Sequence, residues 1–394
     1  MIDFDEAQRL IAAEVQPLGS EHIPIGEASD RILAEPLFAR SDTPRKAVAA
    51  MDGYAVIDAS TRAGEPLQLI GESRAGAGFA GRVEAGQTVR IFTGAPMPDG
   101  GDRCIMQEYA RRDGDYVQFA EGYGPGWHVR NAGSDFRQGD LLLDAGTRLG
   151  PRAMVAAAAA DVADVAVGLR PRVAIIGTGD ELQPPGTAWQ QPDAIPDSVT
   201  FGVAAMVTDA GGVVMDRQTG VDDLAALETL AGRALDMVDL VIITGGASVG
   251  ERDFAKAMFA PHGLQLLFEK VAIKPGKPIW IGRAKGRWVL GLPGNPTSAM
   301  VTARLFLLPL VARLQGQSID EVLRWRTLPL AAPIAATGRR ETFVRARWDD
   351  EGLVPISNQD SGTQAAMVSA DWLIRCEAGQ DPLALGQAVR ALAF

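Results

Sequence analysis

The stretch Arg172-Val173-Ala174-Ile175-Ile176-Gly177-Thr178-Gly179-Asp180 decides the fold class of this protein. A continuous apolar run that ends at a glycine turn is typical of a strand buried on both faces. A similar run returns at Val238 to Thr244, and helical patterns over Ser198 to Ala210 and Asp222 to Leu235 lie between the two strands. Because strands alternate with helices, we expect right-handed βαβ crossovers and a parallel sheet.

The region before this stretch begins with helical patterns. Apolar side chains fall at helical spacing over residues 5–16, after acidic residues that suit a helix N-terminus. A second short helix is expected at Asp30-Arg31-Ile32-Leu33. Residues 141–168 return to a helical pattern, with Pro151 in the first turn. We therefore expect residues 1–40 and 141–168 to form one discontinuous helical domain.

The other segments carry β patterns. Residues 41–140 alternate short apolar runs with glycine-rich turns, which predicts an inserted β domain. The α/β region is expected to cover residues 169–318, and residues 319–394, rich in Thr, Val, Pro and Gly, predict a small all-β domain. The predicted fold class is multidomain α/β plus β.

Composition excludes several classes of protein. Among 394 residues, 38 Lys and Arg stand against 49 Asp and Glu, so the chain lacks the basic footprint of a nucleic-acid-binding protein. Cys104 and Cys376 lie far apart, which favours a reducing compartment over a disulfide framework or zinc site. The first residues are acidic rather than basic, and Asp161 and Asp164 interrupt the apolar stretch Met154 to Leu169. We expect a cytoplasmic protein without a membrane span.

Two glycine-rich loops follow predicted strands and are candidates for binding an anion. In Thr244-Gly245-Gly246-Ala247-Ser248-Val249-Gly250, glycines would let backbone N–H groups approach a ligand, and Ser248 adds a hydroxyl donor. Gly291-Leu292-Pro293-Gly294-Asn295-Pro296 enters a helix, with Asn295 suited to the N-cap and Pro296 to the first helical position. Each loop alone also fits a plain tight turn or a capped helix. Two such loops on one sheet edge favour a shared anionic ligand.

Charged residues near these loops predict the chemistry of that ligand. Lys270 and Lys274 would share one strand face, and with Lys277 they offer point charges for phosphate or another oxyanion. Lysines that protect a solvated edge strand are the plain alternative. Four carboxylates occupy similar loop positions, and carboxylates beside phosphates are typical of a magnesium site. These carboxylates belong to Asp180, Glu181, Asp222 and Asp253.

The inserted β domain contains Ala50-Met51-Asp52-Gly53-Tyr54-Ala55-Val56. Taken alone, Asp-Gly between apolar runs indicates a hairpin turn.

Together these segments resemble the molybdopterin molybdenumtransferase family, MoeA, and the related E domain of gephyrin. The order and spacing of the matching motifs span most of the chain. These motifs are Met51–Val56, Thr93–Pro96, Gly177–Leu182, Thr244–Gly250, Lys274–Pro278 and Gly291–Pro296.

The resemblance implies an elongated homodimer of four-domain chains. The four parts would be the discontinuous helical domain, the inserted β domain, a three-layer α/β domain of the molybdopterin adenylyltransferase type, and a C-terminal β-barrel. The β domain of one subunit would lie over the α/β domain of the other.

The resemblance also implies an activity: insertion of molybdate into adenylated molybdopterin with Mg²⁺, which releases AMP and the molybdenum cofactor. Implied partners are the molybdopterin adenylyltransferase and recipient molybdoenzymes. The expected catalytic residues are Asp52, Thr93, Asp135, Lys270 and Lys274. The expected ligand-binding residues are Gly245, Gly246, Ser248, Asp222, Asp253, Lys277, Pro293, Gly294, Asn295 and Ser361, and the expected metal ligands are Glu181 and Asp180.

Three motifs depart from the family pattern. Lys46-Ala47-Val48-Ala49 stands where Phe-Asp-Asn-Ser is usual, Arg130 to Asp135 replaces an arginine-rich turn, and Ile195 to Val199 lacks an aromatic and an amide. These losses leave open an alternative, a non-catalytic paralogue that binds, delivers or scaffolds the cofactor. A generic nucleotide-binding enzyme is disfavoured because we identify neither a P-loop nor a GxGxxG dinucleotide fingerprint.

Overall fold

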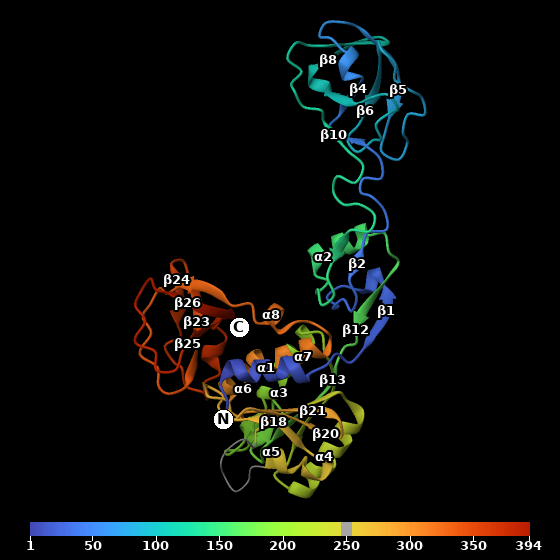
Figure 1. Ribbon diagram of the computed structural model, residues 1–394. Helices are drawn as coiled ribbons and strands as arrows, with labels where there is room; N and C mark the ends of the chain where they lie inside the picture. Colours follow the sequence, from blue (N-terminus) through green and yellow to red (C-terminus); the bar gives the residue numbers. More distant parts are fainter. Residues whose placement is uncertain (246–253) are drawn as a thin grey trace. The chain divides into compact units, whose positions relative to one another are not determined.

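The computed structural model describes residues 1–245 and 254–394, which form two compact units (Figure 1). The first unit comprises residues 1–35, 145–150 and 164–394, and the second comprises residues 36–144 and 151–163. The finer division into four domains stays a prediction.

A six-stranded sheet forms the centre of the first unit, in the order β16-β13-β17-β21-β20-β18. Its strands are β13 (Arg172–Thr178), β16 (Val213–Gly220), β17 (Leu240–Thr244), β18 (Gln265–Glu269), β20 (Trp280–Ala284) and β21 (Arg287–Leu292). The first four strands in this order are parallel, as predicted, whereas β20 pairs antiparallel with both of its neighbours, β21 and β18. A two-residue turn, in which Lys285 and Gly286 both have positive φ, joins β20 to β21 as a hairpin.

Helices cover both faces of this sheet, which confirms the three-layer α/β arrangement (Figure 1). Val173 and Ile175 of β13 pack toward one helical layer, whereas Ala174 and Ile176 pack toward the other. The first layer contains α1 (Phe4–Glu14), α3 (Val199–Asp209), α6 (Pro296–Thr302) and α7 (Leu308–Leu314). The second contains α4 (Leu224–Met237) and α5 (Phe254–Ala257).

The N-terminal region differs from the sequence expectation in two ways. Helix α1 buries its apolar stripe in the core of the α/β layers, although we grouped it with residues 141–168. Helical periodicity shows that a stripe is buried but does not identify the surface that covers it. The helix expected at residues 30–33 is wrong, because Ile32 and Leu33 form β-bridges to Arg148 and Val167. The nearby regular elements are β1 (Ser20–Pro24), the 3-10 turn Ile25–Glu27 and β12 (Asp164–Gly168), and β1 pairs with β12.

One helical run, Pro296–Leu314, is long and apolar enough to cross a membrane, although 83% of its most apolar window is buried inside the protein. The run is continuous because a π-helical turn at Ala303–Leu307 joins α6 to α7 just before Pro309. Proline cannot donate the usual helical hydrogen bond, and a π-turn accommodates that loss. The run is a core helix of the first unit.

The C-terminal β domain confirms the barrel prediction. Its sheet runs in the order β19-β23-β25-β26-β22, with β24 on β23, and a bridge between Leu330 and Leu353 links the end of β22 back to β24. The strands are β19 (Ile273–Lys274), β22 (Arg326–Pro329), β23 (Glu341–Asp349), β24 (Gly352–Pro355), β25 (Trp372–Cys376) and β26 (Ala388–Ala393), and α8 (Ile319–Val322) precedes them.

The second unit contains the predicted β domain, a sheet in the order β7-β4-β6-β5-β9-β8. Its strands are β4 (Gly53–Val56), β5 (Leu67–Ser73), β6 (Gln87–Ile91), β7 (Arg103–Met106), β8 (Ala110–Asp113) and β9 (Tyr116–Phe119). The unit also contains two short strand pairs, β3 (Val48–Ala49) with β10 (Val129–Arg130) and β2 (Leu37–Phe38) with β11 (Leu141–Leu143). Helix α2 (Pro151–Ala159) belongs to the same unit.

Two sequence patterns in this unit have another explanation. The Asp52-Gly53 turn does not join a hairpin, because β3 pairs with β10 whereas β4 pairs with β6 and β7. Gly53 is required instead because a Cβ there would lie 2.0 Å from the carbonyl oxygen of Ile105. The segment Gly76 to Gly81 has the glycine spacing of a dinucleotide fingerprint but leads into strand β6 rather than a helix, so it is not one.

Asp239 joins the starts of three parallel strands in the first unit. Its side chain, in a residue that is 8% exposed, accepts hydrogen bonds from the backbone N–H and guanidinium of Arg172, and Arg287 donates to it at 3.3 Å. Burial has the largest single effect and raises the pKa of the Asp239 carboxyl, but the hydrogen bonds from Arg172 and the positive charges of Arg172 and Arg287 together outweigh it, so the net pKa is below the ordinary value. The ionised Asp239 therefore stabilises the folded state at pH values above the ordinary carboxyl pKa. This stabilisation is lost as the pH falls through the lowered pKa of the folded protein.

We predict that Asp239→Asn destabilises the protein by about 1.5–3 kcal/mol near pH 7, since charge-assisted hydrogen bonds are lost. Calorimetric unfolding should show a lower Tm than wild type, with a difference that is constant down to about pH 5 and shrinks below about pH 4. Asp349→Asn is the control, because its ion pair with Arg347 is exposed and 3.8 Å long. Equal effects of the two substitutions at neutral pH would contradict the assignment.

Candidate functional site

Three parallel strands end beside one another and bring their loops into contact. Gly245, which follows β17, has φ of +94°, and a Cβ there would lie 2.5 Å from the carbonyl oxygen of Thr178 at the end of β13. A Cβ on Gly294, in the loop after β21, would lie 3.2 Å from the Cα of Gly245. Glycine is therefore required at this edge, and the backbone is exposed to close approach by a ligand. Gly245, at the start of the first predicted loop, and Gly294, in the second, therefore lie at one edge of the sheet, as expected.

The predicted metal ligands lie in the loop after β13. A Cβ on Gly179 would lie 2.7 Å from Glu181 Oε2, so the Glu181 carboxylate folds over that glycine. Asp180 Oδ1 accepts a hydrogen bond from the backbone N–H of Asp222 at 2.9 Å. Asp223, directly after Asp222, caps α4 by accepting a hydrogen bond from the N–H of Ala226. Asp180, Glu181 and Asp222 thus occupy adjoining loops.

The loop Pro293-Gly294-Asn295 connects the sheet edge to the C-terminal β domain. Asn295 occupies the N-cap position of α6, as predicted, but its side chain makes no capping hydrogen bond. Its Nδ2 instead donates to the Oγ of Ser361 at 3.1 Å, and the Ser361 carbonyl accepts from the N–H of Thr297 at 3.1 Å. Asn295 and Ser361, predicted separately as ligand-binding residues, are therefore in direct contact.

Arg345 is a residue of this site that sequence reasoning missed. Its side chain, in a residue that is 1% exposed, donates to the carbonyl oxygens of Asn358 and Asp360 at 2.9 and 3.1 Å and to Thr297 Oγ1 at 3.2 Å. Burial lowers the pKa of the Arg345 guanidinium. Arg345 thus holds the loop that carries Ser361. Its only signal in the sequence is a charged side chain in the apolar segment that forms β23.

The predicted lysine strand is wrong, although the lysines are accessible. Lys270 has a left-handed backbone with φ of 59° and follows β18, whereas Lys274 lies in β19, which pairs with β23 of the C-terminal domain. The two side chains therefore do not follow a single period-two strand. Lys270, Lys274 and Lys277 are all exposed, and within the described ranges none of their ammonium groups makes a hydrogen bond or ion pair. They remain available to an anionic ligand.

Asp52 and Thr93 form a pair in the second unit. The backbone N–H and hydroxyl of Thr93 both donate to Asp52 Oδ1 at 2.8 Å. These two hydrogen bonds lower the pKa of the Asp52 carboxyl, so it is ionised at neutral pH. A carboxylate stabilised in this way is a weak base, which suits it to orient a group rather than to remove a proton.

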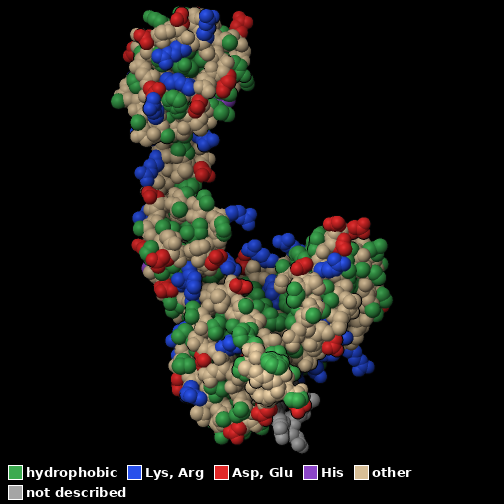
Figure 2. Space-filling model, turned by 180° about the vertical axis from the view of Figure 1, so that it is seen from behind, with side chains coloured by type: hydrophobic (Ala, Val, Ile, Leu, Met, Phe, Trp, Pro, Cys, Tyr) green, Lys and Arg blue, Asp and Glu red, His purple; other side chains and the backbone are tan. Residues whose placement is uncertain are grey.

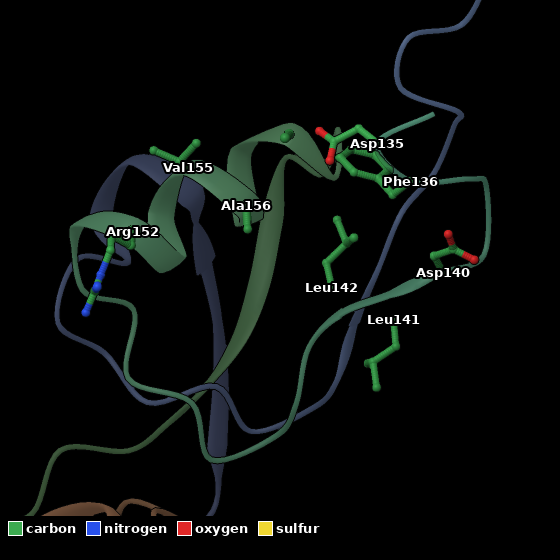
Figure 3. Close-up of a pocket in the computed structure, with 9 residues that line it drawn as sticks. Asp135, Phe136, Asp140, Leu141, Leu142, Arg152, Val155 and Ala156 are labelled. Carbon is green, nitrogen blue, oxygen red and sulfur yellow. The ribbon is translucent and has the colours of Figure 1, made fainter. Parts of the chain in front are cut away.

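Asp135 lines a cavity of about 650 Å³ in the second unit, between β11 and α2 (Figure 3). The cavity is amphipathic, with Leu141 and Leu142 beside Asp135, and Arg152 lies at the opposite end from Asp135. Asp52 and Thr93 do not line this cavity, so the structure does not place Asp135 with that pair. Three further predicted residues, Gly246, Ser248 and Asp253, lie outside the described residues.

Comparison with known proteins identifies the family. Residues 2–160 match the MoeA N-terminal region (domain I and II), residues 174–313 a probable molybdopterin binding domain, and residues 327–394 the MoeA C-terminal region (domain IV). The molybdopterin molybdenumtransferase of Haemophilus influenzae is 33% identical, with 99% of this chain and 98% of that protein aligned. The chain belongs to the MoeA family.

Other relatives agree with this assignment. The molybdopterin molybdenumtransferase of Synechococcus elongatus is 32% identical over 99% of this chain and 98% of that protein. A crystal structure of the molybdopterin biosynthesis MoeA protein from Pyrococcus horikoshii covers 100% of this chain and 99% of its own, with TM-score 0.80 and 28% identity. Another crystal structure of a molybdopterin biosynthesis MoeA protein from Pyrococcus horikoshii OT3, at 24% identity over 100% of both chains and TM-score 0.85, confirms the fold.

We predict that Gly245→Ala destabilises the protein more than Gly286→Ala. Both glycines have positive φ, but a Cβ on Gly286 meets no atom within 4 Å, whereas one on Gly245 collides with Thr178. Both variants should lose about 1–2 kcal/mol for the left-handed backbone, and Gly245→Ala a further ~1–3 kcal/mol for overpacking. Calorimetric Tm values measure the difference, and identical values would show that the loops are not in close contact.

Proposed function

We propose that the protein inserts molybdate into adenylated molybdopterin, with release of AMP and the molybdenum cofactor. Membership of the MoeA family over nearly the whole chain makes it a transferase of molybdenum cofactor biosynthesis. The observation that carries the finer proposal is the meeting of Thr178, Gly245 and Gly294 at one sheet edge. Close backbone approach at the carboxyl ends of parallel strands is suited to an anionic ligand.

The first unit supplies charge and hydrogen-bond donors for the phosphates. Lys270 and Lys274 would bind phosphate oxygens as point charges and stabilise negative charge as the phosphoanhydride breaks. Asn295 and Ser361, joined by a hydrogen bond, would bind the ligand from the adjoining loop.

Asp180 and Glu181 are the proposed magnesium ligands. Two neighbouring carboxylates fit a cation that usually takes one or two carboxylates and completes its coordination with water and phosphate. Among residues 1–245 and 254–394 no group of three or more His, Cys, Asp or Glu side chains could hold a metal, so the ligand phosphates would complete the site. When bound, Mg²⁺ would neutralise charge on the pyrophosphate.

Asp52 is the proposed orienting carboxylate. Asp135 is proposed as a further catalytic residue of the second unit, in addition to Asp52 and Thr93. The intact pair of Asp52 and Thr93 supports catalysis despite the departures in the neighbouring motifs.

We further propose a cytoplasmic homodimer in which the β domain of one subunit lies over the α/β domain of its partner. The molybdopterin adenylyltransferase and recipient molybdoenzymes are the proposed partners. On the visible face in Figure 2, basic and acidic side chains are intermixed, which supports partners other than nucleic acid.

We predict that the purified protein, given adenylated molybdopterin, molybdate and Mg²⁺, releases AMP in proportion to the cofactor formed. The measurement is chromatographic AMP quantification beside a standard family member under identical conditions, with molybdate omitted as the control. Absence of AMP where the standard enzyme turns over would contradict the proposal. Tight cofactor binding without AMP release would instead support the non-catalytic paralogue.

We predict that Asp52→Asn lowers the rate of AMP release at least ~100-fold, because the negative charge that orients the reacting group is lost. Asparagine can still accept the hydrogen bonds from Thr93, although without the charge that strengthens them, and it is an equally good turn former, so Tm should fall only slightly. Asp113→Asn, on the exposed strand β8 of the same sheet, is the matched control. Unchanged turnover of Asp52→Asn would show that Asp52 only shapes the turn.

A further inference from the structure

Arg90 is held between the two segments that carry Asp52 and Thr93. It lies on β6, opposite Tyr54 of β4 in the register of the sheet. Its Nη1 donates to the carbonyl oxygen of Gly53 at 2.7 Å, and its Nη2 donates to Gln107 Oε1 at 2.5 Å. The guanidinium is therefore fixed at both ends of its planar fork.

Both acceptors adjoin Asp52, one along the chain and the other through a hydrogen bond. Gly53 directly follows Asp52 in the chain, and the backbone N–H of Gln107 donates to the carbonyl oxygen of Asp52 at 3.0 Å. Arg90 thus ties the turn to β6 on one side and to Gln107 on the other. The carbonyl groups of Asp52 and Gly53 are both held by this arrangement, which restricts rotation of the turn.

Two aromatic rings complete the contacts of Arg90. Its guanidinium carbon lies 5.1 Å from the ring centre of Tyr54 and 4.6 Å from that of Phe92. Phe92 directly precedes Thr93, so this cation–π contact fixes the segment whose N–H and hydroxyl donate to Asp52. Arg90 therefore contacts a chain neighbour of each member of the pair, Gly53 beside Asp52 and Phe92 beside Thr93.

The charge of Arg90 also acts on Asp52. The pKa of the Asp52 carboxyl is lowered first by the hydrogen bonds from Thr93 and, to a smaller extent, by the positive charge of Arg90. The groups that fix the position of the carboxylate thus also favour its ionised form.

We propose that Arg90 is the positioning residue for the Asp52–Thr93 pair, holding the carboxylate and its hydroxyl partner in one arrangement for the reaction. The inference rests on the proposed function. It requires the planar fork as well as the charge, because a lysine ammonium is a compact point charge that lacks the two separated donor nitrogens with which Arg90 reaches Gly53 and Gln107.

The first test is a double-mutant cycle in the full-length protein. Arg90→Lys should lower kcat for AMP release at least ~10-fold and leave KM within about threefold, since geometry rather than ligand binding is changed. In the Asp52→Asn background the same substitution should cause no further loss, because Arg90 acts through Asp52. Arg111→Lys, on β8 of the same sheet, should leave kcat unchanged. The inference is overturned if Arg90→Lys keeps the wild-type kcat, or lowers it by the same factor in both backgrounds.

A second variant keeps the test independent of the folding of Arg90→Lys. Gln107→Met removes one acceptor of Arg90 and leaves the backbone hydrogen bond from residue 107 to Asp52. It should lower kcat by a smaller factor than Arg90→Lys, and a wild-type kcat would overturn the inference.

A third measurement does not depend on the proposed function. In protein labelled with ¹³C at aspartate carboxyl groups, with the Asp52 signal assigned by its loss in Asp52→Asn, Arg90→Met should raise the pKa of Asp52. An unchanged Asp52 pKa would overturn the inference. If wild-type protein releases no AMP, the proposed function fails, while this titration still decides the role of Arg90.

Discussion

Where β13, β17 and β21 end, the backbone of the first unit is packed as closely as glycine allows. A Cβ on Gly245 would reach the Thr178 carbonyl, and one on Gly294 would reach Gly245 itself. This contact follows from a sheet buried on both faces, whose parallel strands end at one edge. Any side chain at Gly245 would move the loops apart, so the site depends on this close approach.

The C-terminal β domain is joined to that edge by polar contacts as well as by the chain. Arg345 donates hydrogen bonds to two backbone carbonyl groups of the loop that carries Ser361, and Asn295 donates a hydrogen bond to Ser361. Strand β19, with Lys274, pairs with β23 of the same domain. Candidate binding residues separated by long stretches of chain are therefore held by one set of contacts, and their relative positions depend on a buried arginine.

In the second unit, neighbouring residues favour the ionised form of the Asp52 carboxylate and restrict its orientation. Thr93 stabilises the ionised form of Asp52, and Arg90 fixes the backbone on both sides of the pair. The hydrogen bonds and the neighbouring positive charge act in the same direction on the Asp52 pKa. Such an arrangement needs little rearrangement during a reaction, which is the condition for efficient electrostatic stabilisation.

The sequence by itself determined the class of fold, the family and most of the candidate residues. Continuous apolar runs require strands buried on both faces, and glycines at their ends indicate turns with close backbone approach, so the positions of Gly245 and Gly294 could be read directly. Asp52 and Thr93 could be predicted only as separate motif positions, because hydrogen bonds between distant segments leave no periodic signal. The surface covering α1, the backbone of Lys270, and the partners of Arg345 and Arg90 were decided by tertiary structure. Periodicity reports that a side chain is buried or exposed, whereas its partners depend on which elements pack together in space.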